Sequence, residues 1–237
     1  PQDCGLDGGE YCAIWLGPEM PGDQRRDDSY SQCYDSEPIT ERLDIIGAPV
    51  IRLKIKSDAK SGQVIVRLNH IHPDGASTRI TYGCLNLSHR NGHEKTSDIV
   101  PNELMDIEVI LDQTAYRVPE GHKIRVSISN CYWPLLWPTP DKDTLTLVQG
   151  KFDLPISSHG DLDERKFQPA VVGEPWKIKS LREGCNQRNV KRDLKSGIVT
   201  TEIIDDFGKR MDQEHGLITG STAREWWSIH PDDPLSA

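Results

Sequence analysis

Apolar and polar residues alternate in short runs from residue 45 onward. In residues 50–56, Ile51, Leu53 and Ile55 occupy every second position, with Arg and Lys between them. Successive side chains of a strand point to opposite faces, so this run predicts a strand with one buried and one solvated face. The same β signal returns at residues 64–68, 78–87, 107–111, 124–128 and 145–147.

Turn sequences separate these runs. Pro73-Asp74-Gly75 and Pro119-Glu120-Gly121 favour turns, because Pro presets φ and Gly accepts positive φ. Recurring strands without a long helical pattern predict an all-β antiparallel sandwich of the jelly-roll type. Helical structure is expected only as one or two short turns, near Glu103 or after Trp137.

Two parts are expected along the chain. Residues 1–159 would form the sandwich, entered through a loop-like segment at residues 1–44 that is rich in Gly, Pro, Asp and Glu. Residues 160–237 would form a smaller β extension, irregular over 160–190, with strands at 197–204, near 217–218 and at 226–229. Asp205-Asp206-Phe207-Gly208 is the predicted hairpin turn, and more β structure is expected beyond residue 237.

The chain has 237 residues and a formal net charge of -9, and its acidity is concentrated at the start. Residues 1–44 hold 3 Lys or Arg against 11 Asp or Glu, which indicates either a solvated loop or a surface that docks on a partner domain. No basic patch with interleaved aromatic residues is present, which argues against a nucleic-acid partner. No apolar run approaches the roughly 20 residues of a membrane-spanning helix, so no membrane partner is expected.

Six cysteines stand at positions 4, 12, 33, 84, 131 and 185, far apart and without a CxxC pair. In a chain of this length, that spacing predicts free thiols and a cytoplasmic location. A disulfide among Cys4, Cys12 and Cys33 is the alternative.

Motifs for catalysis are missing from the sequence. It contains neither the G-x-S-x-G elbow of a serine hydrolase nor a glycine-rich phosphate loop, so no catalytic residue is predicted. His70 and His72, and likewise His89 and His93, have spacings that metals can use, but no Cys or acidic residue completes either set. We therefore expect surface or structural histidines, no metal and no cofactor.

The most informative cluster is the aromatic loop, residues 130–138 (NCYWPLLWP), which directly follows the run at 124–128. It holds more apolar surface than a solvated loop needs. One interpretation is that it folds over an end of the sandwich core. The other is that it lies against another domain or a substrate, with Tyr132, Trp133, Leu136 and Trp137 as the interface or cleft-lining residues.

An ordered set of segments carries a family resemblance: residues 21–28 (PGDQRRDD), 34–40 (YDSEPIT), 46–49 (IGAP), 72–75 (HPDG), 85–90 (LNLSHR), 115–125 (AYRVPEGHKIR) and Trp133-Pro134. Together they resemble the C-terminal domain of the CocE/NonD hydrolases, which include cocaine esterase, α-amino acid ester hydrolases and X-Pro dipeptidyl-peptidases. This chain carries His72 where relatives often have an acidic residue. The part after residue 160 resembles the extension of a bacterial subgroup.

The resemblance implies a galactose-binding-like jelly roll that packs on an α/β-hydrolase domain of the same polypeptide and helps to form its cleft. It also implies that the catalytic triad lies on that domain, which hydrolyses esters, amides or X-Pro dipeptides. The first functional hypothesis is therefore a non-catalytic accessory domain. A carbohydrate-binding module is the alternative, and a third hypothesis is a homo-oligomer formed through the aromatic loop.

Overall fold

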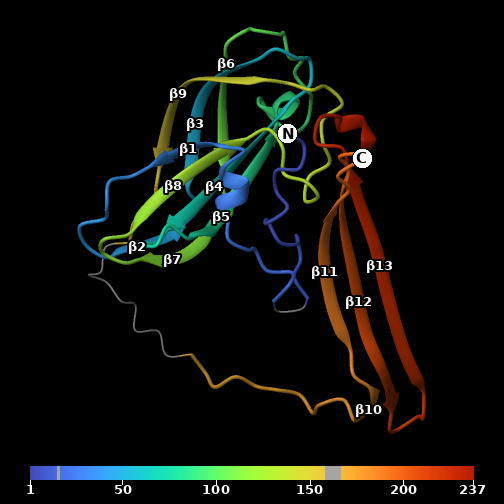
Figure 1. Cartoon of the computed structure of the whole chain (residues 1–237). Helices are drawn as coiled ribbons and strands as arrows, with labels where there is room; N and C mark the ends of the chain where they lie inside the picture. Colours follow the sequence, from blue (N-terminus) through green and yellow to red (C-terminus); the bar gives the residue numbers. More distant parts are fainter. Residues whose placement is uncertain (15–16, 158–166) are drawn as a thin grey trace.

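The computed structural model describes residues 1–14, 17–157 and 167–237 (Figure 1). Nearly all of its regular structure is β. The strands are β1 (Gln32–Asp35), β2 (Leu43–Gly47), β3 (Val50–Ser57), β4 (Gln63–Ile71), β5 (Ser77–Asn86), β6 (Met105–Ile110), β7 (Thr114–Val118), β8 (Lys123–Ser129), β9 (Leu145–Asp153), β10 (Ile178–Arg182), β11 (Cys185–Arg192), β12 (Val199–Asp212) and β13 (Ile218–Ile229). Short helices are α1 (Arg25–Asp28), η1 (Leu87–His89) and η2 (Pro234–Ser236), and not at the two expected positions.

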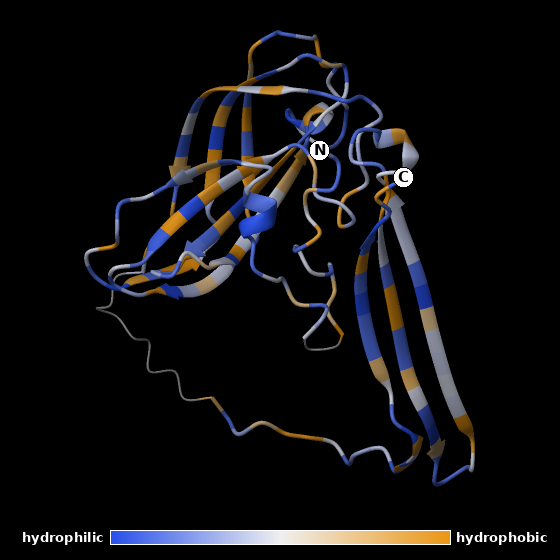
Figure 2. Ribbon diagram, in the orientation of Figure 1, coloured by the Kyte–Doolittle hydropathy of each residue, from blue (hydrophilic) through white to orange (hydrophobic). Residues whose placement is uncertain are grey.

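The strands from β1 to β9 build a sandwich around one core. One sheet has the strand order β1-β8-β4-β5, the other has the order β6-β3-β9, and the β2-β7 pair adjoins them. Every second residue of β3, β4 and β6 enters the core, among them Leu53, Val66 and Ile107. This alternation is visible along the strands in Figure 2. The predicted all-β sandwich is confirmed, while its jelly-roll and galactose-binding-like connectivity stays a prediction.

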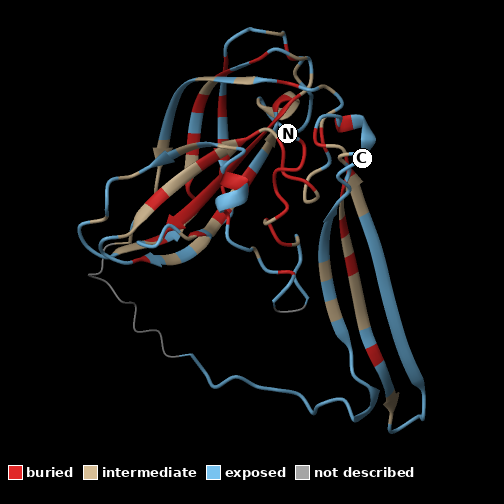
Figure 3. Ribbon diagram, in the orientation of Figure 1, coloured by how far each residue is buried: buried red, intermediate tan, exposed pale blue. Residues whose placement is uncertain are grey.

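Strand β4 is buried on both faces, because the N-terminal segment (residues 1–14 and 17–31) covers the side that points away from the core (Figure 3). Asp28 of that segment is the centre of a buried polar network. Its carboxylate contacts the side chains of Asn69 (2.9 Å), Ser77 (2.8 Å), Arg125 (3.2 Å), Ser127 (2.8 Å) and Arg67 (3.0 Å).

The acidic entry segment is therefore not a solvated loop at this point. Asp27 and Asp28 are buried, and burial without partners would cost several kcal/mol for each charge. Arg67 and Arg125 neutralise Asp28, and backbone N–H groups of Gly5 and Asp7 donate to Asp27. The acidic residues thus fasten the segment to the sandwich.

A long antiparallel sheet, with β12 between β13 and the β10–β11 edge, makes up the last part of the chain. Two sequence expectations fail here. Residues 160–190 were expected to be irregular, but β10 and most of β11 lie within them. Residues 205–208, expected to be a hairpin turn, continue inside β12 as a β-bulge. The bulge explains the turn-like residues, since Gly208 has φ +72° within the strand.

The N-terminal segment lies between the sandwich and this sheet (Figure 1). A second apolar cluster joins four segments that are distant in sequence, and consists of Cys4, Leu6, Cys131, Trp133, Val199 and Ile229. The expected boundary between residues 159 and 160 lies outside the described residues. All six cysteines, each within the described ranges, are free thiols. None of the described helices is long and apolar enough to cross a membrane.

Candidate functional site

The aromatic loop, residues 130–138, leaves β8 and is held at both its start and its middle. The Asn130 side-chain amide donates to the carbonyl oxygen of Asp143 at 2.9 Å and to its Oδ1 at 3.1 Å. The backbone N–H of Trp133 donates to the carbonyl oxygen of Cys4 at 2.8 Å, and the Trp133–Pro134 peptide is cis. The loop is therefore tied to the N-terminal segment and has a defined shape.

Tyr132 is a buried anchor of the loop. Its hydroxyl accepts a hydrogen bond from Arg79, and its ring lies 5.5 Å from that of Tyr82. The Arg79 guanidinium stacks over the Tyr82 ring at 4.6 Å, so the same cation contacts both tyrosine side chains. Burial raises the pKa of Tyr132 to about 12, which keeps the hydroxyl protonated at physiological pH.

Trp133, Trp137 and Trp227 form a tryptophan cluster in which all ring pairs meet edge to face. Their ring centroids lie 5.3 Å apart for Trp133 and Trp137, 6.2 Å for Trp133 and Trp227, and 6.3 Å for Trp137 and Trp227. Such aromatic pairs contribute about 0.5–1.5 kcal/mol beyond their area burial. The cluster fastens the aromatic loop to the end of β13.

The structure separates the four predicted interface residues into two groups. Tyr132 and Trp133 are buried within this chain, with Trp133 only 1% exposed. Leu136 is half-buried and Trp137 is 59% exposed. Only the second pair offers surface to another molecule, and its role as an interface stays a prediction.

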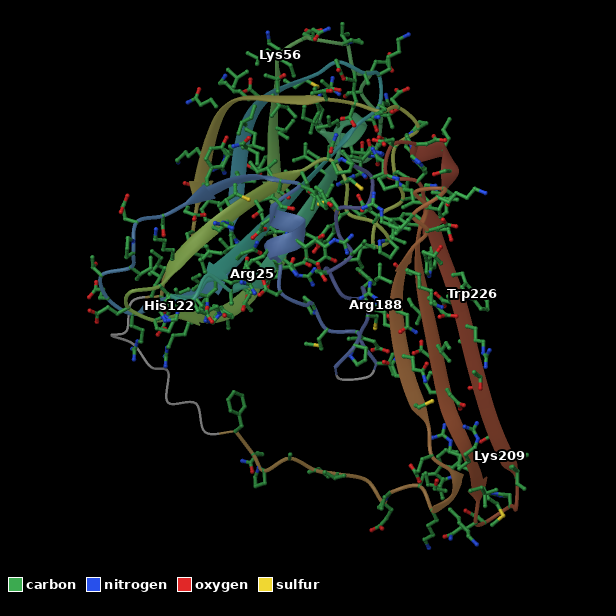
Figure 4. The ribbon with its side chains drawn as sticks, viewed as in Figure 1. Arg25, Lys56, His122, Arg188, Lys209 and Trp226 are labelled. Atoms are coloured by element: carbon green, nitrogen blue, oxygen red, sulfur yellow. The ribbon has the colours of Figure 1, made fainter. Side chains whose placement is uncertain are left out.

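Trp226 is an exposed aromatic residue whose surface position the sequence did not indicate. It neighbours Trp227 on β13, so the two rings point to opposite faces, and Trp226 is 60% exposed (Figure 4). Its indole N–H donates to Glu202 at 3.2 Å, and Lys191 forms an ion pair with the same carboxylate at 2.7 Å. Hydrogen bonds from Lys191 and Trp226 lower the pKa of Glu202, which stays ionised.

Surface hollows lie beside the loop and along two strands of the sandwich. One of about 290 Å³ lies between the N-terminal segment, the aromatic loop and β11–β13, and is lined by Tyr11, Cys12, Pro134, Leu135, Arg188, Ile203, Glu225 and Trp227. Hollows of about 390 and 510 Å³ lie along β8 and β9, and both are lined by Tyr34, Leu53, Ile128 and Leu147. These surfaces are suited to a covering partner or an apolar ligand.

A different set of side chains meets at the far end of the sandwich. His70 and His72 of the β4 end lie beside His122, which precedes β8 and was not singled out from the sequence as a candidate ligand. His70 Nε2 is 2.6 Å from His122 Nδ1, and His70 Nδ1 is 2.9 Å from the Tyr116 hydroxyl. Burial and the two neighbouring imidazoles lower the pKa of His70 to about 4, so His70 is neutral at physiological pH.

The sequence did not indicate His122 as a candidate ligand, because strand pairing, and not sequence spacing, brings it close to His70. Of the other histidines with metal-compatible spacing, His89 ends η1 and His93 follows in the loop after it, with ring centroids 5.3 Å apart.

Comparisons with known proteins agree with this architecture. A family model described as the X-Pro dipeptidyl-peptidase C-terminal non-catalytic domain matches residues 7–176. The cocaine esterase of Rhodococcus sp. (strain MB1 Bresler) is 26% identical over 122 residues, which are 50% of this chain and 21% of that protein.

Solved structures share the fold. An aminopeptidase from the marine sediment archaeon Thaumarchaeota archaeon has a TM-score of 0.56 at 19% identity, over 62% of this chain and 30% of that one. An α-amino acid ester hydrolase has a TM-score of 0.54 at 19% identity, over 57% of this chain and 27% of that one. This chain thus spans less than a third of the length of each of these relatives. The family match over most of the chain shows that it belongs to the X-Pro dipeptidyl-peptidase C-terminal non-catalytic domains, as found in hydrolases of the CocE/NonD type.

Proposed function

We propose that this chain is the accessory domain of a CocE/NonD-type serine hydrolase and packs on an α/β-hydrolase domain of the same polypeptide. In this role it stabilises the catalytic domain and shapes one side of its cleft. The catalytic domain would hydrolyse acyl esters, amides or X-Pro dipeptides through a serine acyl-enzyme. The related proteins support that range, since they are named as an esterase, an ester hydrolase and an aminopeptidase.

The observation that carries the proposal is the apolar surface left uncovered on β13 and the aromatic loop. Trp226 and Trp137 are each exposed by more than half. Ile218 at the other end of β13, and Leu217 just before it, are exposed as well. Strands β10, β11 and β13 are largely solvent-exposed (Figure 3). A narrow sheet with so little buried area is marginally stable alone, and its exposed apolar residues are typical of a protein interface.

Within this interface, the residues have distinct roles. Leu136 and Trp137 would contact the hydrolase domain, while buried Tyr132 and Trp133 hold the aromatic loop in shape. The hollow between the loop, the N-terminal segment and β11–β13 would receive an apolar element of the partner or border the substrate cleft.

The test compares the full-length gene product with this chain alone. Trp226→Ala removes an exposed side chain outside the tryptophan cluster, so it should leave the Tm of the isolated chain nearly unchanged. Trp137→Ala also removes two ring pairs of that cluster, so it should lower the Tm of the isolated chain by a few degrees. In the full-length protein, the same substitutions should lower the Tm by several degrees and reduce kcat/KM for p-nitrophenyl acetate. Ile110→Ala is the matched control, because Ile110 is similarly exposed on the sandwich and lies outside the hollows described above.

Two results would overturn the proposal. One is a gene that encodes no α/β-hydrolase domain with a G-x-S-x-G elbow together with this chain. The other is turnover of p-nitrophenyl acetate by the isolated chain that a serine-directed inhibitor abolishes.

The carbohydrate-binding alternative keeps one supporting observation, the exposed ring of Trp137. Trp133 cannot stack on a sugar, because it is buried. Calorimetry against a glycan panel separates the two functions: sugar binding that is lost in Trp137→Ala and retained in Ile110→Ala would favour the binding module.

A further inference from the structure

The pairing of β4 with β8 creates a cluster of histidines at one end of the sandwich. Antiparallel partners in this pair include His70 with Ile124 and Ile71 with Lys123. His72 and His122 are the next residues beyond this pairing, and their ring centroids lie 5.4 Å apart. His70 and His72 are two positions apart, so both side chains point to the core side of β4, where His122 also points.

We propose that His70, His72 and His122 form a binding site for a transition-metal dication of the zinc class. One ring nitrogen from each residue lies within 4.8 Å of the others. Metal–nitrogen bonds of about 2.0–2.1 Å place the nitrogens of a tetrahedral site roughly 3.4 Å apart. The 2.6 Å separation of His70 and His122 therefore has to widen slightly, which ring rotations can supply. Three imidazole ligands leave one position for water or another ligand.

Neighbouring side chains already orient the rings as a metal site requires. The Tyr116 hydroxyl holds His70 Nδ1 at 2.9 Å, which leaves Nε2 facing His122. Thr78 Oγ1 lies 3.0 Å from His72 Nε2 and fixes that ring as well. Hydrogen bonds to the non-ligating nitrogen of a metal-binding histidine are the usual outer-shell arrangement, and they set both tautomer and orientation.

The cluster has the donor chemistry of zinc, copper, nickel or cobalt and lacks that of magnesium or calcium. All three donors are imidazole nitrogens, whereas magnesium and calcium prefer oxygen ligands. Without a metal, His70 Nε2 and His122 Nδ1 must share one proton at 2.6 Å, and a cation between them would replace that proton.

The location separates this site from the proposed interface with the hydrolase domain. His122 lies at the end of the sandwich remote from Trp226 and β11–β13 (Figure 4). A bound metal would link the end of β4 to the start of β8, with β7 contributing Tyr116. It would therefore stabilise the sandwich without covering the aromatic loop.

Metal titration of the tag-free chain, first stripped with a chelator, tests the site. Calorimetry with ZnCl2 should show one ion per chain, and CoCl2 should give the visible absorption of a tetrahedral complex. Saturating zinc should raise the Tm, because it binds the folded state. His72→Ala and His122→Ala should each weaken zinc binding at least tenfold, and Tyr116→Phe should weaken it to a smaller extent.

The control is the double variant His89→Ala/His93→Ala, which removes two histidines outside the cluster and should bind zinc as the unaltered chain does. His72 and His122 are chosen because both are only half-buried, and circular dichroism in chelator confirms that the variants fold. The proposal is overturned if the unaltered chain binds zinc no more tightly than His72→Ala and His122→Ala, or if the His89/His93 variant alone loses binding.

Discussion

Asp143 shows how a single buried carboxyl can make the anchoring of the aromatic loop depend on pH. Its Oδ1 accepts from Asn130, and its Oδ2 is buried without a hydrogen-bond partner among the described residues. Burial, together with the nearby Asp58 and Asp141 carboxylates, raises the pKa of Asp143 from 3.8 to about 6. The folded chain therefore holds a proton on Asp143 at pH values where the unfolded chain has released it.

The expected consequence is a loss of stability as pH rises through the window from about 4 to about 6. Asp143→Asn removes this contribution. The free energy of unfolding of the variant, relative to the unaltered chain, should thus increase by about 1–2 kcal/mol between pH 4.5 and pH 7.5, after allowance for solvent screening. Urea unfolding at the two pH values measures the difference. Asp106→Asn, at an exposed carboxylate, should show no such change, and equal pH slopes for Asp143→Asn and the unaltered chain would contradict the assignment.

The β-bulge of β12 depends on Gly208, and a change at this residue would affect the pairing of the whole strand. The register with β13 shifts between Asp206 and Lys209, and Gly208 has φ +72°. A Cβ at this position would press on the carbonyl oxygen of Arg182 and lie 2.8 Å from the N atom of Gly184. The bulge thus lets the connection between β10 and β11 approach β12 closely at Gly208, while Arg182 ion-pairs with Asp206 at 2.7 Å.

Gly208→Ala should destabilise the β10–β13 sheet by about 2–3 kcal/mol, because strain at positive φ adds to the contact with backbone. Gly216→Ala is the control: it has φ +69° at a turn, and no described atom lies within 4 Å of an added Cβ. It should cost about 1 kcal/mol. Native-state hydrogen exchange of the β12 and β13 amides measures the loss of stability in each variant. Equal losses in Gly208→Ala and Gly216→Ala would argue against the close approach of backbone atoms to Gly208.

At the scale of elements, the sequence predicted those strands that bury one face. Strands β3, β6 and β8 alternate because the core receives every second side chain. Strands β10 and β11 carry no such pattern, since both of their faces are mostly exposed, and they were missed. The bulge in β12 was taken for a turn because both structures select Gly and Asp.

For the candidate site, the sequence predicted the apolar character of the aromatic loop but not the long-range contacts that bury part of it. The composition of the loop identified it as an apolar surface, and its residues do form a packed cluster. The burial of Trp133 depends on Cys4 and Leu6, which lie more than 120 positions earlier, and on β13. Likewise, His122 meets His70 and His72 only through the β4–β8 register. Such long-range pairings have no local sequence signal, because they depend on which strands become neighbours.

At the scale of the molecule, the N-terminal segment and the aromatic loop together connect the sandwich to the β10–β13 sheet. The polar residues of the N-terminal segment fasten it to the sandwich through Asp28, and Leu6 and Cys4 pack in the second apolar cluster beside Val199 and Ile229 of the sheet. The backbone N–H of Gln2 also donates to the carbonyl oxygen of Pro231 at 2.7 Å. The position of the β10–β13 sheet therefore depends on this cluster and on the tryptophan cluster.

Ile229 is the residue of the sheet that best tests this dependence, since it is fully buried at the end of β13. Ile229→Ala should cost about 2–4 kcal/mol through lost burial and a residual cavity. Because the cluster joins the sheet to the rest of the chain, limited proteolysis should remove the sheet from the variant several-fold faster, while the sandwich resists. Ile218→Ala, near the exposed start of the same strand, should change neither stability nor cleavage appreciably. Simultaneous digestion of sheet and sandwich in Ile229→Ala would instead show that both unfold as one cooperative unit, held together by more than this cluster.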